Sequence, residues 1–292
     1  MQVKIGENKV LTLQGGQSYG GIEVIGYLKG ANVSSGDPVP PVLNAQNINL
    51  KITVYRQNKT VICINHNMLL LATYCLLKER FLPWVGGLQL VEADGLTGGT
   101  WLYPAFIDFQ TPLTLAVGES ADVELTVNSN AVASCDTGVS FFDFYQRVSA
   151  NVGVGTPTFK FDVIQSNNDT LNQPLMNNVF SVKWLNFDQT DWLQVNAVIV
   201  SVSLTSDQKK WMKVYYELVA ELYDYVAPRI PLNNTDENIP ANLYYPQTFN
   251  LYEKLPHDKQ VILLTNASIN ASMNSVNVNA SQNYIGQIYL TF

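Results

Sequence analysis

The stretch TSDQKKWMKVYYELVAELYDYVAPRIP, residues 205–231, is the one long helical pattern in a chain that otherwise consists of short strand patterns and polar turns. Its apolar side chains recur at steps of three and four, which places them on one stripe of a helix: Trp211, Tyr215, Leu218, Leu222 and Tyr225. Thr205 and Gln208 fit a capping box at its start, and Pro228 marks its end. The sequence therefore predicts a helix inserted into a β-rich protein.

A second helical pattern occurs earlier in the chain, at residues 67–80, and ends before Pro83. This segment is apolar nearly all round its middle turns, as a helix enclosed by protein would be. We expect it to be deeply buried.

The two helices belong to a longer repeat. Each is followed by a Leu-Tyr-Pro element, WLYPAFIDFQTPLTLAVGESADVELTV at residues 101–127 and NLYYPQTFNLYEKLPHDKQVILLTN at residues 242–266. Pro104 and Pro246 lie 142 positions apart, which is nearly half the chain, and in both copies a charged turn and a β-rich run follow. This period indicates a duplicated domain, because solenoid repeats are about 20–50 residues long. We place the boundary within residues 148–158, giving domains at 1–150 and 151–292.

Short runs of β-forming residues between turn signals predict the strands. They lie at residues 9–13, 21–28, 48–55, 60–64, 121–127, 139–145, 158–164, 179–185, 195–204, 260–265 and 284–292. Their length and spacing favour a sandwich, jelly roll or barrel. Residues 265–281 are rich in Asn and Ser, and we expect a long loop or an irregular edge there.

Composition and charge disfavour several classes of function. The formal net charge of −7 disfavours direct binding of nucleic acid or of anionic lipid. The N-terminal residues lack the features of a signal peptide, and the longest apolar run is too short to span a bilayer. Three cysteines without metal-ligand spacing make a disulfide framework improbable. We expect a protein that folds in a reducing cytoplasm and has no transmembrane segment.

Candidate catalytic residues are few. The two histidines, His66 and His257, are expected to cap or pack a helix and to face solvent, respectively. Asp136-Thr137-Gly138 matches the aspartic-protease tripeptide, but that chemistry needs a second carboxylate and the tripeptide occurs once, so a turn is the better interpretation. We predict no catalytic residue, no cofactor and no metal site, and therefore no enzyme.

Two β-rich halves, each with a helix after a strand pair and a Leu-Tyr-Pro element, resemble the double jelly-roll major capsid proteins of icosahedral, membrane-containing bacteriophages, of the corticovirus or the Flavobacterium-infecting lipid-phage kind. The resemblance covers the whole chain and implies an all-β fold of two tandem eight-stranded jelly rolls, each with an inserted helix. It also implies a homotrimer acting as a pseudo-hexameric capsomer of the virion. Its partners would be neighbouring capsomers and minor capsid, penton or membrane proteins, after assembly in the host cytoplasm.

If the chain forms such a capsomer, the second predicted helix, within residues 205–231, has more apolar residues than one buried stripe requires. Tyr216, Val219 and Tyr223 lie outside the stripe, and we expect them to contact a neighbouring roll or subunit. The alternative is a carbohydrate-binding or adhesin-like β-sandwich protein, including a spike of a phage or bacterium. A jelly-roll glycosidase would need two carboxylates about 5–10 Å apart on facing strands, which the sequence cannot show.

Overall fold

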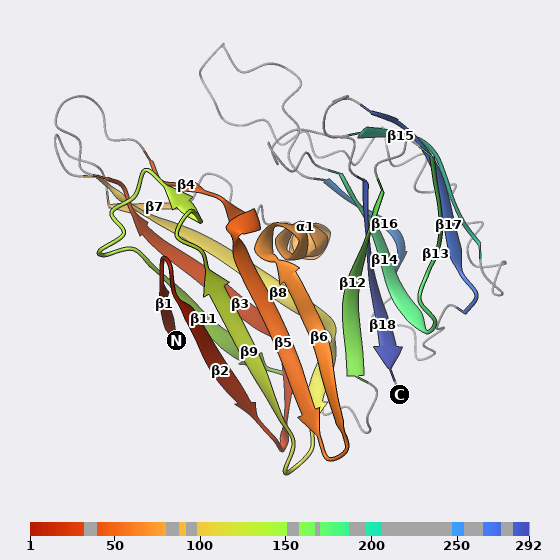
Figure 1. Ribbon diagram of the computed structural model, residues 1–292, viewed down its shortest axis with the longest axis horizontal. Helices are drawn as coiled ribbons and strands as arrows, with labels where there is room; N and C mark the ends of the chain where they lie inside the picture. Colours follow the sequence, from red (N-terminus) through yellow and green to blue (C-terminus); the bar gives the residue numbers. More distant parts are fainter. Residues whose placement is uncertain are drawn as a thin grey trace. The chain divides into compact units, whose positions relative to one another are not determined.

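The computed structural model describes residues 1–31, 40–79, 88–91, 98–150, 158–166, 170–186, 197–205, 247–253, 265–275 and 283–291. The chain divides into two compact units, Met1–Thr158 and Phe159–Phe292. Each unit is built from antiparallel sheets (Figure 1).

The first unit has two main sheets. One has the order β1-β11-β3-β8-β7, with β1 at Gln2–Lys4, β11 at Phe141–Val148, β3 at Gln17–Lys29, β8 at Thr100–Leu115 and β7 at Leu88–Val91. The other has the order β2-β9-β5-β6, with β2 at Asn8–Gln14, β9 at Ser120–Val127, β5 at Ile48–Arg56 and β6 at Lys59–Asn67. A small pair joins β4, Val42–Leu43, to β10, Val132–Ala133, and a 3-10 turn, η1, spans Ala45–Asn47.

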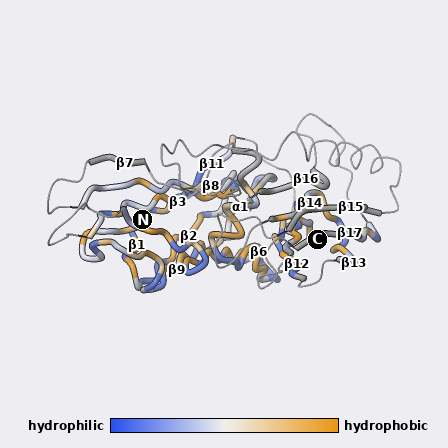
Figure 2. The backbone as a smooth tube through the Cα atoms, turned by 90° about the horizontal axis from the view of Figure 1, so that it is seen from above, coloured by the Kyte–Doolittle hydropathy of each residue, from blue (hydrophilic) through white to orange (hydrophobic). Residues whose placement is uncertain are grey.

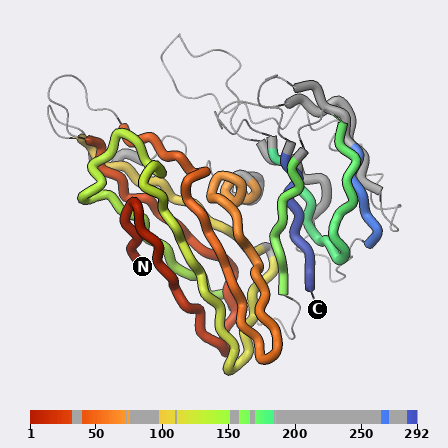
Figure 3. Tube along the Cα trace, viewed as in Figure 1, coloured from red at the N-terminus to blue at the C-terminus, as the bar shows by residue number. Residues whose placement is uncertain are grey.

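The strand order of these two sheets is that of a jelly roll. If the eight principal strands β1, β2, β3, β5, β6, β8, β9 and β11 are counted in chain order, the sheets run first-eighth-third-sixth and second-seventh-fourth-fifth. The first and last strands therefore lie side by side, as Figure 3 shows for the red and green segments near the N-terminus. Such closure pairs strands that are more than 130 residues apart, and it covers edges that an open sheet would expose.

The second unit repeats this order. One sheet runs β12-β18-β14-β16, with β12 at Thr158–Ser166, β18 at Asn283–Thr291, β14 at Val179–Asn186 and β16 at Gln247–Glu253. The other runs β13-β17-β15, with β13 at Thr170–Pro174, β17 at Ser268–Ser275 and β15 at Ala197–Thr205. The described strands thus occupy seven of the eight jelly-roll positions in the same order as in the first unit. The predicted fold class, two tandem jelly rolls, is confirmed.

Strict alternation of buried and more exposed residues produces the core of the first unit. β9 alternates along its whole length, and its inward side chains Ala121, Val123, Leu125 and Val127 are at most 1% exposed. Figure 2 shows the same interleaving of hydrophobic and hydrophilic residues along the strands. Alternation with a period of two is what one buried sheet face requires.

The first predicted helix is confirmed as α1, Met68–Glu79. Its start is fixed by Asn67, whose side-chain oxygen accepts a 3.0 Å hydrogen bond from the Leu70 amide. Every side chain described on it is buried, as expected for a helix that is apolar all round: Met68, Leu69, Leu70, Leu71, Ala72, Tyr74 and Cys75. His66 is half-buried in β6, one residue before the capping position.

One prediction about the second half was wrong. Residues 265–281 were expected to form a loop or irregular edge, but Ser268–Ser275 is β17, the central strand of its sheet. It is therefore β17 that corresponds to β9 of the first unit, and not residues 261–265. β17 is held by pairing on both sides, to β13 and to β15, so tertiary pairing overrides the weak strand preference of its Asn and Ser residues.

Candidate functional site

The residues singled out on the second predicted helix fall outside the described part of the chain. Tyr216, Val219 and Tyr223 belong to residues 206–246, and their role at an interface stays a prediction. The same holds for His257 and for residues 242–246, which begin the Leu-Tyr-Pro element of the second half and directly precede β16.

The aspartic-protease tripeptide forms a turn, as the sequence predicted. The Asp136 carboxylate accepts a 3.0 Å hydrogen bond from the Gly138 amide, and the Asp136 carbonyl accepts another, of 3.1 Å, from the Ser140 amide. These bonds close the connection that leads into β11. The carboxylate is thus engaged in local backbone structure.

No group of three or more potential metal ligands occurs among the residues that the structure describes. Within the same part of the chain, no helix combines the length and hydropathy that crossing a bilayer requires. The Cys63 and Cys75 side chains are buried. Desolvation, followed by the charge of the neighbouring Asp136, raises the pKa of the half-buried Cys135 thiol. These features give no support to a nucleophilic or metal-dependent site in the described residues.

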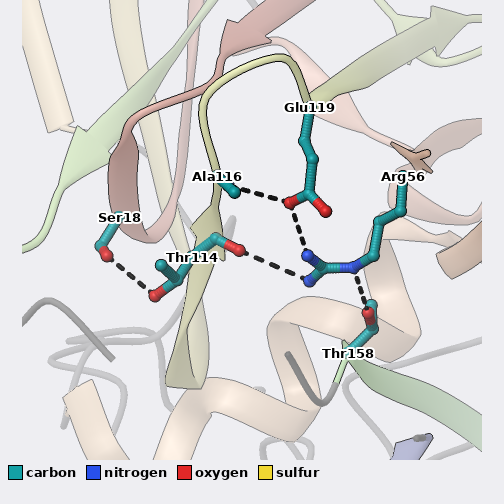
Figure 4. A network of polar contacts seen from close by, with 6 residues as sticks. All are labelled: Ser18, Arg56, Thr114, Ala116, Glu119 and Thr158. Atoms are coloured by element: carbon teal, nitrogen blue, oxygen red, sulfur yellow. Dashed lines mark hydrogen bonds and ion pairs between the residues drawn. The ribbon is translucent and has the colours of Figure 1, made fainter. Parts of the chain in front are cut away.

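The most buried ion pair described lies at one end of the first unit, between the end of β5 and the turn that connects β8 to β9 (Figure 4). Arg56, at the end of β5, donates to the Glu119 carboxylate at 2.6 Å, and the two side chains are 12% and 10% exposed. Arg56 also donates to the Thr158 hydroxyl at 3.0 Å and to the Thr114 carbonyl at 3.4 Å, while Glu119 accepts from the Ala116 amide at 2.9 Å. With its donors and acceptors used in this way, the pair has a structural role.

The outer face of the β2-β9-β5-β6 sheet is mainly polar, and we call it the polar face. Its outward residues are Asn8, Val10 and Thr12 on β2, Asp122, Glu124 and Thr126 on β9, Asn49, Lys51, Thr53 and Tyr55 on β5, and Thr60, Ile62 and Asn65 on β6. Hydrogen bonds between side chains run across it, from Thr12 to Asp122 at 2.8 Å and from Asn8 to Thr126 at 3.0 Å. This is the chemistry of a sheet face in contact with water.

The outer face of the other sheet is different, and we call it the aromatic face. Its outward residues are Phe141, Asp143, Tyr145 and Arg147 on β11, Glu23, Ile25 and Tyr27 on β3, and Leu102, Pro104, Phe106 and Asp108 on β8. Seven of these eleven side chains are aromatic, aliphatic or proline. All except Tyr145 and Arg147 are half-buried, and those two are exposed.

The aromatic face is ordered by contacts among its own side chains. The rings of Tyr27 and Phe141 are stacked with centroids 5.0 Å apart. The Arg147 guanidinium lies 4.6 Å from the centre of the Phe106 ring and forms an ion pair with Glu23 at 2.6 Å. These contacts fix three rings and two charged groups across three neighbouring strands.

Gly21 makes this arrangement possible. A β-carbon at position 21 would lie 2.5 Å from the Ile107 carbonyl oxygen and 2.7 Å from the Phe106 ring. Only glycine leaves room for the ring to lie against β3. This face was not among the sequence-based predictions, although the sequence contains a signal for it. Along residues 21–28 both alternating sets contain apolar residues, Ile22 and Val24 in one and Ile25 and Tyr27 in the other.

Two tyrosines of similar exposure mark the two faces. Tyr145 on the aromatic face is 39% exposed and Tyr55 on the polar face is 41% exposed. Desolvation, with the nearby Glu23 carboxylate as the next cause, raises the pKa of Tyr145, while desolvation and Asp122 raise that of Tyr55. Both phenols therefore stay protonated at neutral pH.

Comparisons with known proteins point to one fold. No protein-family model matches the chain, and no curated protein matches its sequence. Among solved structures it is similar to the STIV MCP, the major capsid protein of Sulfolobus turreted icosahedral virus, with a TM-score of 0.54 and 10% identity over 99% of this chain and 93% of that chain. A chain in the atomic structure of the same virus gives a TM-score of 0.50 with 12% identity, over 99% and 88% of the two chains. The major capsid protein P2 of bacteriophage PM2 gives 0.45 with 12% identity, over 99% and 93%.

The similarity to the STIV protein spans both units, because nearly all of this chain is matched by nearly all of that one. Together with the repeated order of the strands, it shows the architecture as a whole. The chain has the double jelly-roll fold of a viral major capsid protein.

Proposed function

We propose that this chain is the major capsid protein of an icosahedral virus and has a structural rather than an enzymatic role. The observation that carries the proposal is the double jelly roll itself, repeated in both units and matched along nearly the whole length of the STIV major capsid protein. The division into a first roll at residues 1–150 and a second at 151–292 is part of the proposal.

Three copies of the chain would form one capsomer. Two similar rolls per chain give six similar units per trimer, which is how a trimer can occupy a pseudo-hexagonal place in a shell. Neighbouring capsomers and minor proteins of the virion would then be its partners, with assembly in the host cytoplasm.

The mass of the purified protein in solution tests this proposal. Size-exclusion chromatography with light scattering should give three times the chain mass of 32.5 kDa, and electron microscopy should show particles of hexagonal outline. A strict monomer that binds glycans on an array would contradict the proposal and favour an adhesin.

A second experiment tests the predicted interface on the second helix. Replacing Tyr216 and Tyr223 by Ser should weaken the trimer, because each change removes an aromatic side chain expected to contact a neighbour. Lys209→Ser on the same predicted helix is the control. Trimers of unchanged mass and unchanged dissociation on dilution would remove these residues from the interface.

A further inference from the structure

The aromatic face of the first unit has the composition of a protein interface and not of a solvated sheet. A sheet face in water carries polar side chains, as the polar face of the same unit does. On the aromatic face Tyr, Phe and Arg gather around Glu23, and Tyr and Arg are among the residue types that carry most binding energy at interfaces. The difference between two faces of one sandwich needs a cause beyond the stability of the fold.

The charges of the aromatic face are paired and its side chains are ordered, so that the face can be buried at low cost. Glu23 is paired with Arg147, and Asp143 has the Met1 ammonium group 4.0 Å away, so covering these carboxylates would not leave either charge alone. The Tyr27 and Phe141 rings and the Phe106 and Arg147 side chains already hold one another in place. Side chains ordered in advance lose less conformational entropy on binding.

We propose that the aromatic face is a contact surface for a second copy of this chain, centred on Tyr27, Phe106 and Arg147. The inference rests on the proposed function, since a coat is built from copies of its own chain. In a closed ring a surface of this kind meets a different surface of the next copy.

The chemistry of the face favours a protein partner over the other candidates. A glycan would need free acceptors next to an exposed ring. One Glu23 oxygen already accepts two hydrogen bonds from Arg147, at 2.8 Å and 2.6 Å, and the same carboxylate is hydrogen-bonded to Tyr145. An anionic lipid surface would be repelled by a chain of formal net charge −7. The balanced charges of the aromatic face permit contact with another copy despite that net charge.

Oxidation of side chains by hydroxyl radicals compares the two faces in the unmodified protein. Tyr145 and Tyr55 are matched, with 39% and 41% exposure in the single chain. On dilution from trimer to monomer, oxidation of Tyr145 should rise at least threefold, and that of Tyr55 should stay within about 1.5-fold. Equal behaviour of the two tyrosines would overturn the proposal, and a protein that is monomeric at every concentration would overturn the proposed function with it.

Paired variants give a second readout. Tyr27→Thr/Phe141→Thr should raise the concentration at which the trimer dissociates by at least about tenfold, since truncation of one central interface residue costs that much or more. Val10→Thr/Ile62→Thr on the polar face is the control and should change it by less than about threefold. Threonine keeps strand preference, so both variants retain the sheets.

A fall in the melting temperature of the monomer with unchanged trimer dissociation would show that the face is covered by the chain itself, and would overturn the inference. Tyr145→Ser, which changes one exposed side chain, supplies a milder variant if the double variant fails to fold. It should weaken the trimer by about threefold or more without altering the melting temperature of the monomer. No weakening would count against the proposal.

Discussion

The two sheets of the first unit have the same inner face and different outer faces. Inside, β11 and β3 contribute Phe142, Phe144 and Val24, and β9 and β5 contribute Leu125 and Ile52, all of them fully buried. Outside, one sheet carries hydroxyls, amides and charges, and the other carries a stacked Tyr27–Phe141 pair and an arginine on a phenylalanine ring. The fold requires the inner pattern alone, so the outer pattern is free to serve assembly.

The first test of this comparison concerns the shared core, where the largest effects are expected. Phe144→Ala should lower the free energy of unfolding by about 4 kcal/mol, because a fully buried ring is lost and a cavity remains. Leu125→Ala in the facing sheet should cost about 3 kcal/mol. Denaturant unfolding measures both. A loss below about 1 kcal/mol for either variant would mean that the two sheets do not share one core.

The second test concerns the Arg56–Glu119 ion pair between β5 and the turn that connects β8 to β9. Arg56→Met should cost about 2–3 kcal/mol, because it leaves the Glu119 carboxylate largely buried without its cation. Arg56→Met/Glu119→Gln should recover part of this loss, since the buried charge is then removed as well. Denaturant midpoints compare the two variants. If the double variant were the less stable one, attraction within the pair would dominate its desolvation.

The third test uses pH. Tyr103, on the inner side of β8, donates to the Pro41 carbonyl at 2.7 Å, and burial raises the pKa of its phenol to about 12. Because the folded pKa lies above the unfolded value of 10.0, its contribution to stability is complete below pH 10 and is lost as pH rises through about 12. Tyr103→Phe should cost about 1 kcal/mol at neutral pH and flatten the alkaline decline.

The free energy of unfolding, measured from neutral pH to about pH 12, gives the pH dependence of stability for the wild type and for Tyr103→Phe. Tyr55→Phe is the comparison, because the pKa of this exposed phenol is also raised, but less than that of Tyr103, so its loss should flatten the decline less. An identical decline in the wild type and Tyr103→Phe would exclude Tyr103 as its source.

The smallest effect is expected on the polar face. Lys51 and Glu124 form an ion pair at 3.6 Å with side chains 39% and 32% exposed, and such surface pairs contribute little. Lys51→Met should change the free energy of unfolding by less than about 0.5 kcal/mol and leave the trimer intact. A marked loss of assembly in this variant would assign the polar face to a contact as well, and would weaken the contrast between the faces.

Much of the fold follows from periodicity in the sequence. The strands expected at residues 9–13, 21–28, 48–55 and 121–127 are β2, β3, β5 and β9, and the buried first helix is α1. These segments have alternation or continuous apolar character strong enough for local preference and tertiary packing to agree.

β8 shows why some strands were not predicted from the sequence. It contains Pro104 and Pro112, and prolines usually exclude a central strand. Pro104 pairs with Ile25 of β3, but the described pairing of β7 with β8 extends only from Thr100 to Leu102, so at Pro104 no pairing with β7 is described. Pro112 lies where the β3 and β8 register is interrupted, between Asp108 and Leu113. A proline can be accommodated at both places.

β17 was not predicted from the sequence, and the reason differs from that for β8. Its apolar residues alternate correctly, with Ile269, Ala271 and Met273 at every second position, but Ser and Asn fill the rest and are poor strand formers. Ile269 is fully buried, which shows that the alternation carried the signal and that composition masked it. The aromatic face was missed because a single sequence does not reveal which of two apolar sets along a strand faces outward.

Gly21 couples the sequence of β3 to the shape of the aromatic face, because the Phe106 ring and the Ile107 carbonyl already fill the place that a side chain at position 21 would need. A methyl group there would displace the Phe106 ring, and Arg147 would lose its support even though neither residue had changed. Natural variants should therefore be free to exchange the aromatic residues of the face for one another while position 21 stays glycine. Sequence drift on the aromatic face would then change its rings and charges, while the backbone at position 21 continues to tolerate no side chain.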